Sequence, residues 1–162
     1  MKKLIALVSV ALIFGLYMNA YSADNVTQTV TYEVQAINEI TVSGNPGALV
    51  ISTATAGSQP TAATDATTSY SVTTNGTNKK ITGSIDTAMP ANTSLLVTLT
   101  APTGGSSAGQ VALSTTAQDL VTGISTLAES GLTISYEFTA DAAAGVVASS
   151  TKTVTLTVAD GS

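Results

Sequence analysis

Serine and threonine hydroxyls are the most frequent groups in this sequence that are able to act as nucleophiles. A nucleophilic hydroxyl needs a base beside it, and in most hydrolases that base is a histidine. The sequence has no His, no Cys and no Arg, and its only cationic side chains are five Lys. Any base would therefore have to be a lysine or a carboxylate. We predict no catalytic residues and no enzymatic activity.

Carboxylates are the other groups that do acid–base chemistry, and glycoside hydrolysis uses two of them at a set separation. The sequence offers ten Asp and Glu, but their spacing selects no pair. The aromatic side chains that would stack on a sugar are also few. Tyr32, Tyr70, Tyr136 and Phe138 all lie in the apolar phase of alternating segments, so we expect them in the core.

Metal, cofactor and nucleic-acid sites receive no support from the composition. Without His and Cys, the usual nitrogen and sulfur ligands of zinc are missing. Calcium needs only oxygen ligands, yet no Asp-x-Asp-x-Asp-Gly loop occurs. A basic face that follows phosphates cannot be built without Arg and with so few Lys. We predict no metal, no cofactor and no nucleic-acid partner.

The N-terminus has the three parts of an export signal. Lys2 and Lys3 provide a positive end, and an apolar run follows from Leu4 to Leu16. Ala20-Tyr21-Ser22 places small residues at the two positions that a signal peptidase inspects. We predict that residues 1–22 are a signal peptide cleaved after Ser22. A retained anchor is the alternative, but the apolar run is short for a span, which needs about 20 residues.

Residues 23–162 predict one secreted domain. They carry three Lys against ten Asp and Glu, a net charge of −7. About 140 residues suit a single domain, and no stretch rich in Pro, Gly or charge divides them. No further apolar run resembles a membrane span, so we expect none after cleavage.

The segments after residue 22 alternate as antiparallel strands do. Apolar and polar residues follow a period of two in several runs, with Gly, Asn and Pro between them. Residues 115–130 are the best helix candidate, but their Thr and Gly favour a short strand and loops. The clearest strands are predicted at residues 26–42, 70–72, 95–99, 132–138 and 154–158, with shorter ones at 48–51, 81–85, 110–113 and 120–124.

This spacing predicts an all-β fold, an immunoglobulin-like antiparallel β-sandwich of about 7–9 strands. The Cys pair and core Trp of antibody domains are absent, so the prediction depends on strand number and alternation. Asn75-Gly76, followed by Lys79 and Lys80, is expected to form a hairpin turn with an exposed cationic tip.

The N-terminal strand, residues 24–42, is long for its domain. Its 17 alternating residues from Val26 would extend about 56 Å, whereas a compact domain of this size is about 37 Å across. One explanation is that residues 24–34 pair with a neighbouring subunit and bury Val26, Val30, Tyr32 and Val34 there. The other is a bend, because the alternation slips at residues 36–38 as it does at a β-bulge. A bend and an exchange are compatible.

A Thr/Val-rich strand at residues 26–34, a sandwich without Cys and a closing Thr-Val-Thr-Leu-Thr-Val strand follow the predicted signal peptide. In this combination the sequence resembles secreted, Cys-free filament subunits of the donor-strand type, which include pilin-like bacterial surface fibre proteins. The likeness covers the architecture of residues 24–158. It implies a structural subunit of an extracellular filament or surface layer, whose N-terminal strand adds to a neighbour's sheet edge.

The resemblance also implies partners and a location. The protein would polymerise with itself on a cell-surface appendage, and a periplasmic chaperone or an outer-membrane assembly factor would be a further partner. The alternative is a monomeric secreted adhesin or ligand-binding β-sandwich module whose first strand folds back. The low charge density favours the filament, because it suits close lateral packing.

Overall fold

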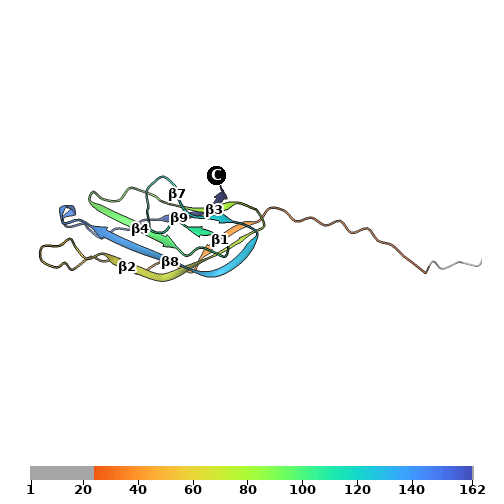
Figure 1. Ribbon diagram of the computed structural model, residues 1–162, viewed down its shortest axis with the longest axis horizontal. Coiled ribbons are helices and arrows are strands. Elements are labelled where there is room, and N and C mark those ends of the chain that lie inside the picture. Colours follow the sequence, from red (N-terminus) through yellow and green to blue (C-terminus); the bar gives the residue numbers. More distant parts are fainter. Residues whose placement is uncertain (1–23, 162) are drawn as a thin grey trace, which may run out of the picture. The chain divides into compact units, whose positions relative to one another are not determined.

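The computed structural model describes residues 24–161, which belong to two compact units, Met1–Glu33 and Val34–Ser162. Of the first unit, residues 24–33 are described, and they contain no helix and no strand. The predicted signal peptide, residues 1–22, lies outside the described residues. All the strands found among the described residues belong to the second unit, which is shown in Figure 1.

The described part of the second unit contains nine strands and one short 3-10 turn, joined by turns and irregular segments. Short strands and tight turns are what the Thr- and Val-rich, Gly-punctuated sequence favours. The elements are β1 Asn38–Val42, β2 Ala63–Thr74, β3 Lys79–Ile85, β4 Thr93–Leu99, β5 Ser106–Ser107, β6 Val111–Ala112, β7 Gln118–Ile124, β8 Leu127–Ala140, the 3-10 turn Ala142–Ala144 and β9 Val154–Asp160.

The strands form two sheets in which every pair is antiparallel. One sheet has the order β1-β2-β8-β4-β6 and the other has the order β5-β7-β3-β9. The prediction of an all-β antiparallel fold is confirmed, and two sheets of five and four strands are consistent with a β-sandwich. No helix among residues 24–161 has the length and apolar character to cross a membrane.

The core contains side chains from both sheets. In β4 the buried residues are Leu95, Val97 and Leu99, so the predicted alternation directs every second side chain inward. Each such burial contributes about 1.5–3 kcal/mol. The buried apolar residues are Tyr70, Val72, Ile81, Ile85, Leu95, Val97, Leu99, Leu113, Leu120, Val121, Ile124, Leu132, Ile134 and Tyr136.

The turn at Asn75-Gly76 corrects one prediction. The flanking strands β2 and β3 belong to different sheets, so the turn passes from one sheet to the other and closes no hairpin. The side chains of Lys79 and Lys80 are only 17% and 19% exposed, and they form ion pairs with Asp160 and Asp119. The predicted exposed cationic tip is therefore wrong, because β9 and β7 bring acidic partners alongside β3.

The predicted N-terminal strand is shorter in the structure than its alternation suggested. A strand is present only at Asn38–Val42, and residues 25–37 carry none. The start of β1 lies at the slip in the alternation, residues 36–38, where one of the two explanations expects a bend. Residues 48–51, predicted as a short strand, are also irregular. The interpretation of residues 115–130 as short strand and loops is confirmed, since β7 and the start of β8 occupy them.

Candidate functional site

The four residues predicted to enter a neighbouring subunit are exposed. The side chains of Val26, Val30, Tyr32 and Val34 are 87%, 75%, 91% and 79% exposed. These four residues occupy even-numbered positions. Every odd-numbered position between Val26 and Val34 carries Thr or Glu. Large apolar side chains left in water at a period of two mark a surface suited to another strand.

Tyr32 corrects part of the prediction for the aromatic residues. Tyr70 and Tyr136 are in the core as expected, whereas Phe138 is half-buried and Tyr32 is exposed. The Tyr70 hydroxyl donates a hydrogen bond to the carbonyl of Thr100 at 2.6 Å. Burial, with a smaller contribution from the charge of Glu129, raises the pKa of Tyr70 to about 12.

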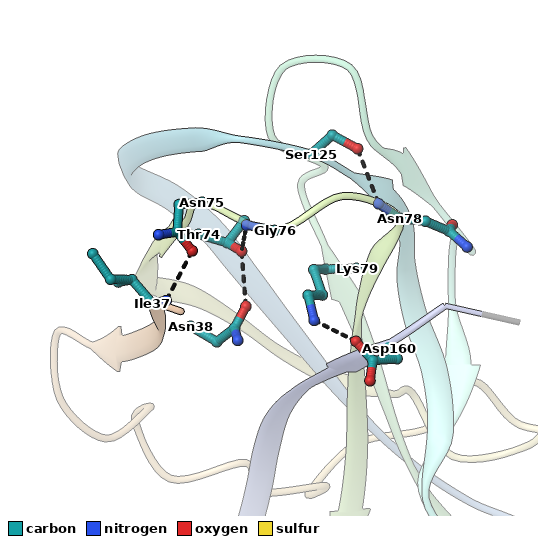
Figure 2. A network of polar contacts seen from close by, with 9 residues as sticks. All are labelled: Ile37, Asn38, Thr74, Asn75, Gly76, Asn78, Lys79, Ser125 and Asp160. Carbon is teal, nitrogen blue, oxygen red and sulfur yellow. Dashed lines mark hydrogen bonds and ion pairs between the residues drawn. The ribbon is translucent and has the colours of Figure 1, made fainter. Parts of the chain in front are cut away.

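Asn75 holds the chain immediately before β1. Its amide Nδ2 donates to the carbonyl of Gln35 at 2.7 Å, and its Oδ1 accepts from the amide of Ile37 at 2.8 Å. The second of these bonds is drawn in Figure 2. A side-chain amide that bonds a backbone on both sides in this way imitates a neighbouring strand. Asn75 therefore holds residues 35–37, which lead into β1, beside the end of β2.

A second polar contact secures the first residue of β1. Thr74 is buried in β2, and its hydroxyl lies 2.8 Å from Oδ1 of Asn38, to which it donates. The same hydroxyl oxygen accepts from the amide of Gly76 at 3.0 Å (Figure 2). Sequence reasoning missed this cluster and the Asn75 contacts, because a strand partner 36 to 40 residues away leaves no local pattern.

No strand among residues 24–161 is hydrogen-bonded to the outer edge of β9, although β1 lies near β9. The amide of Asp86 donates to the carbonyl of Thr153, and the amide of Gly161 donates to the carbonyl of Asn78. In and beside β9, the odd-numbered residues are therefore the ones whose backbone groups are hydrogen-bonded to the β3 side. The backbone groups of the even-numbered residues consequently point to the free edge. These residues are Val154, Leu156, Val158 and Asp160.

An apolar groove lies beside the start of β9. It has a volume of about 1460 Å³ and is bounded by residues 44–54 and 145–153, which have no regular strand. Residues of β1, of β8 and of the start of β9 also line it. Side chains that line it include Ile40, Leu49, Leu95, Ile134, Tyr136 and Leu156.

One buried hydroxyl in the groove is left unpaired. Thr68 in β2 is 5% exposed and lines the groove, and its Oγ1 has no hydrogen-bond partner. A buried hydroxyl without a partner costs about 1–3 kcal/mol. The groove is therefore lined by both apolar and polar residues, and Thr68 contributes a buried hydroxyl that no described residue satisfies.

Asp65 ties one wall of the groove to β2. Its carboxylate accepts from the amide and the hydroxyl of Thr67 at 3.1 and 2.8 Å, and from the amide of Gly47 at 3.2 Å. These hydrogen bonds hold the pKa of Asp65 below its usual range, and those from Thr67 have the largest effect. The hydrogen bond and charge of Lys79 likewise lower the pKa of Asp160.

We expect the second unit to lose stability in acid through these two carboxylates. Their pKa values are lower in the folded than in the unfolded chain, so their contribution is present above the unfolded pKa and is lost as pH falls through the folded pKa. The melting temperature should therefore fall between about pH 5 and about pH 2. Thermal unfolding at stepped pH measures it. Asp65→Asn should reduce the fall, and Thr67→Val, which removes one donor, should reduce it less. An unchanged pH profile in Asp65→Asn would contradict this assignment.

Two serine spacings used by nucleophilic enzymes occur in the chain, although neither was predicted as a site. Gly105-Ser106-Ser107-Ala108-Gly109 has the Gly-x-Ser-x-Gly pattern, but Ser107 ends the two-residue strand β5, no helix follows, and its Oγ accepts from Gly109. Ser149 precedes Lys152 by three residues. Lys152 Nζ donates to the hydroxyl of Thr87 at 2.7 Å and to the carbonyl of Ala88 at 2.9 Å. Neither serine gains a base from these contacts.

Comparison with protein-family models, with curated proteins and with solved structures finds no match to this chain. The described residues also contain no group of three or more acidic side chains placed to hold a metal ion. The features suited to binding a partner are therefore residues 24–34 with their exposed apolar side chains, the outer edge of β9 and the groove beside it.

Proposed function

We propose that this protein is a secreted, non-enzymatic structural subunit of an extracellular filament or surface layer that polymerises by β-strand addition. Residues 24–34 of one subunit add to a sheet edge of the next. The observation that carries the proposal is the exposure of Val26, Val30, Tyr32 and Val34 at alternate positions. Strand addition satisfies the segment's backbone groups and covers these side chains in one step.

Burial of the exposed apolar side chains favours association, whereas the ordering of residues 24–34 opposes it. Burying an apolar side chain of this size contributes about 1.5–3 kcal/mol, and ordering a residue costs about 1–2 kcal/mol of backbone entropy. Burial of the four side chains offsets part of the cost of ordering residues 24–34, and the new ladder of hydrogen bonds must offset the rest. The absence of Cys means that no disulfide shares this role, and repeated head to tail the contact forms a fibre.

The same proposal includes an immunoglobulin-like fold and export of the protein to the cell surface. We infer that the sandwich is immunoglobulin-like, which the two antiparallel sheets and the strand number support. Export by a cleaved signal peptide, location on a cell-surface appendage, and help from a chaperone or an outer-membrane assembly factor are supported by the sequence alone.

Polymerisation of residues 23–162, compared with a truncated chain that begins at residue 35, tests the proposal. Both chains are unfolded in denaturant, refolded at increasing concentration, and examined by electron microscopy and size-exclusion chromatography. The longer chain should form ordered polymers and the truncated chain should stay a folded monomer. A strict monomer for both chains over the whole concentration range would reject the proposal and favour a monomeric binding module. Polymers from both would exclude residues 24–34 as the donor.

A further inference from the structure

We propose that Asn75 is a site of spontaneous deamidation, and that its contacts with residues 35–37 decide when the reaction occurs. Asn75-Gly76 is the one Asn-Gly dipeptide of the sequence. Because glycine has no Cβ to shield its amide nitrogen, this nitrogen approaches the preceding side chain more closely than that of another residue does. Asn75 is exposed, so water has access to it. The site operates whether or not the chain polymerises.

The reaction takes place within the chain and consumes only water. The backbone nitrogen of Gly76 loses its proton, attacks Cγ of Asn75 and forms a new C–N bond. The bond from Cγ to Nδ2 then breaks, and Nδ2 leaves as ammonia with the proton that Gly76 gave up. Water opens the resulting succinimide ring at one of its two carbonyls, which gives aspartate or isoaspartate. Either product carries one negative charge more than asparagine, and no oxidant or reductant takes part.

Hydrogen bonds hold both reacting groups in the folded chain. Nδ2, the leaving group, donates to the carbonyl of Gln35 at 2.7 Å, and Oδ1 accepts from the amide of Ile37 at 2.8 Å. The attacking nitrogen of Gly76 donates its hydrogen to the hydroxyl oxygen of Thr74 at 3.0 Å (Figure 2). Attack requires the Asn75 side chain to rotate and the Gly76 nitrogen to lose its hydrogen, so these bonds have to break first.

The backbone around the dipeptide is held as well. The amide of Asn75 donates to the carbonyl of Ile37 at 3.2 Å, and the carbonyl of Gly76 accepts from the amide of Thr126 at 2.9 Å. While these bonds persist, the two peptide groups do not turn to bring the nitrogen onto Cγ. The closed contact therefore protects Asn75, and the reaction proceeds from a locally opened state.

The product does not remake the contact. A carboxylate has no hydrogen to donate, so the bond to the carbonyl of Gln35 is lost and two acceptor oxygens face each other there. Isoaspartate also adds one carbon atom to the main chain at this position. Asn75 is therefore an irreversible switch, because an opening of residues 35–37 that ends in reaction leaves them released from the end of β2.

Deamidation rates in closed and opened chains test this site. The purified chain is incubated at mildly alkaline pH, folded or unfolded in denaturant, and peptide mass spectrometry follows the reaction at Asn75. Two variants weaken the closed contact. Ile37→Pro removes the amide from which Oδ1 accepts, and Thr74→Val removes the hydroxyl to which Gly76 donates. The matched control is Thr73→Val, an exposed neighbouring position on the other face of β2.

We expect Asn75 to react at least about tenfold more slowly in the folded chain than in the unfolded one. Each variant should raise the folded-state rate about fivefold, the change in the opening equilibrium that follows the loss of one typical hydrogen bond. Thr73→Val should leave the rate unchanged. Circular dichroism checks that each variant is folded, and Thr74→Val decides the outcome if Ile37→Pro does not fold. Equal rates in folded and unfolded chains, or no acceleration in Thr74→Val, would overturn the protection.

Hydrogen exchange on the product tests the switch. Ion-exchange chromatography separates the deamidated chain by its additional negative charge. Residues 35–37 should exchange their amide hydrogens faster in this product than in the unreacted chain, whereas exchange in β4 should stay the same. Unchanged exchange at residues 35–37 would mean that the contact survives the reaction, and the switch would be rejected.

Discussion

Replacing Val30 with Asp is expected to stop polymer formation while leaving the subunit folded. The Val30 side chain is 75% exposed and belongs to the first unit, so the core of the second unit does not need it. In the proposed contact the new carboxylate would be buried against apolar side chains without a partner, at a cost of several kcal/mol. A loss of about 3 kcal/mol per contact raises the concentration needed for assembly about 100-fold.

The matched control is Thr31→Asp, which adds the same charge one residue later on the opposite face of the strand. It should polymerise at a concentration within a few-fold of the unsubstituted chain, whereas Val34→Asp should behave like Val30→Asp. Sedimentation measures the polymer fraction, and circular dichroism checks the fold of each monomer. Normal filaments from both Val variants, or equal inhibition by Thr31→Asp, would contradict a donor strand with an apolar face.

Enlarging Gly83 is expected to have the largest effect on the stability of the subunit. Gly83 is buried in the middle of β3, where a Cβ atom would lie 2.6 Å from Cδ1 of Leu120 and 3.3 Å from Cδ2 of Leu113. Both leucines are buried, so neither has room to move aside. Gly83→Ala should lower the free energy of unfolding by about 1–3 kcal/mol, and Gly83→Val should lower it further.

Denaturant unfolding of the Gly83 variants measures this effect. Ser84→Val provides the control, since it adds a β-branched side chain to the neighbouring position on the other face of β3. It should change stability by less than about 0.5 kcal/mol. Leu120→Val combined with Gly83→Ala should restore part of the loss, because the two side chains compete for one space. Wild-type stability in Gly83→Val would show that the core is looser than the structure describes.

Alternation along the chain allowed most of the strands to be predicted. β4 and β9 carry Leu and Val at every second position, and a strand that buries one face needs this pattern whatever its neighbours are. The fold class follows for the same reason. The hairpin expected at Asn75-Gly76 was wrong because a turn dipeptide reports local backbone shape and carries no information about which sheet receives the next strand.

The candidate site was likewise predicted only in part from the sequence. Val26, Val30, Tyr32 and Val34 were predicted from their period alone, and their exposure in the structure leaves the exchange of residues 24–34 a prediction. The groove and the free edge of β9 were not predicted. Both depend on which strands pair, and pairing joins residues far apart in the sequence, as between β3 and β9.

What the sequence determined by itself was therefore the alternation, the all-β class and the apolar face of the N-terminal segment, because each is a property of neighbouring residues. The tertiary structure alone decided that β9 ends its sheet, that Asn75 bonds the backbone of Gln35 and Ile37, and that Lys79 and Lys80 are paired. Whether a strand lies at the edge of a sheet depends on which other strands pair with it. That pairing is established only when the chain folds.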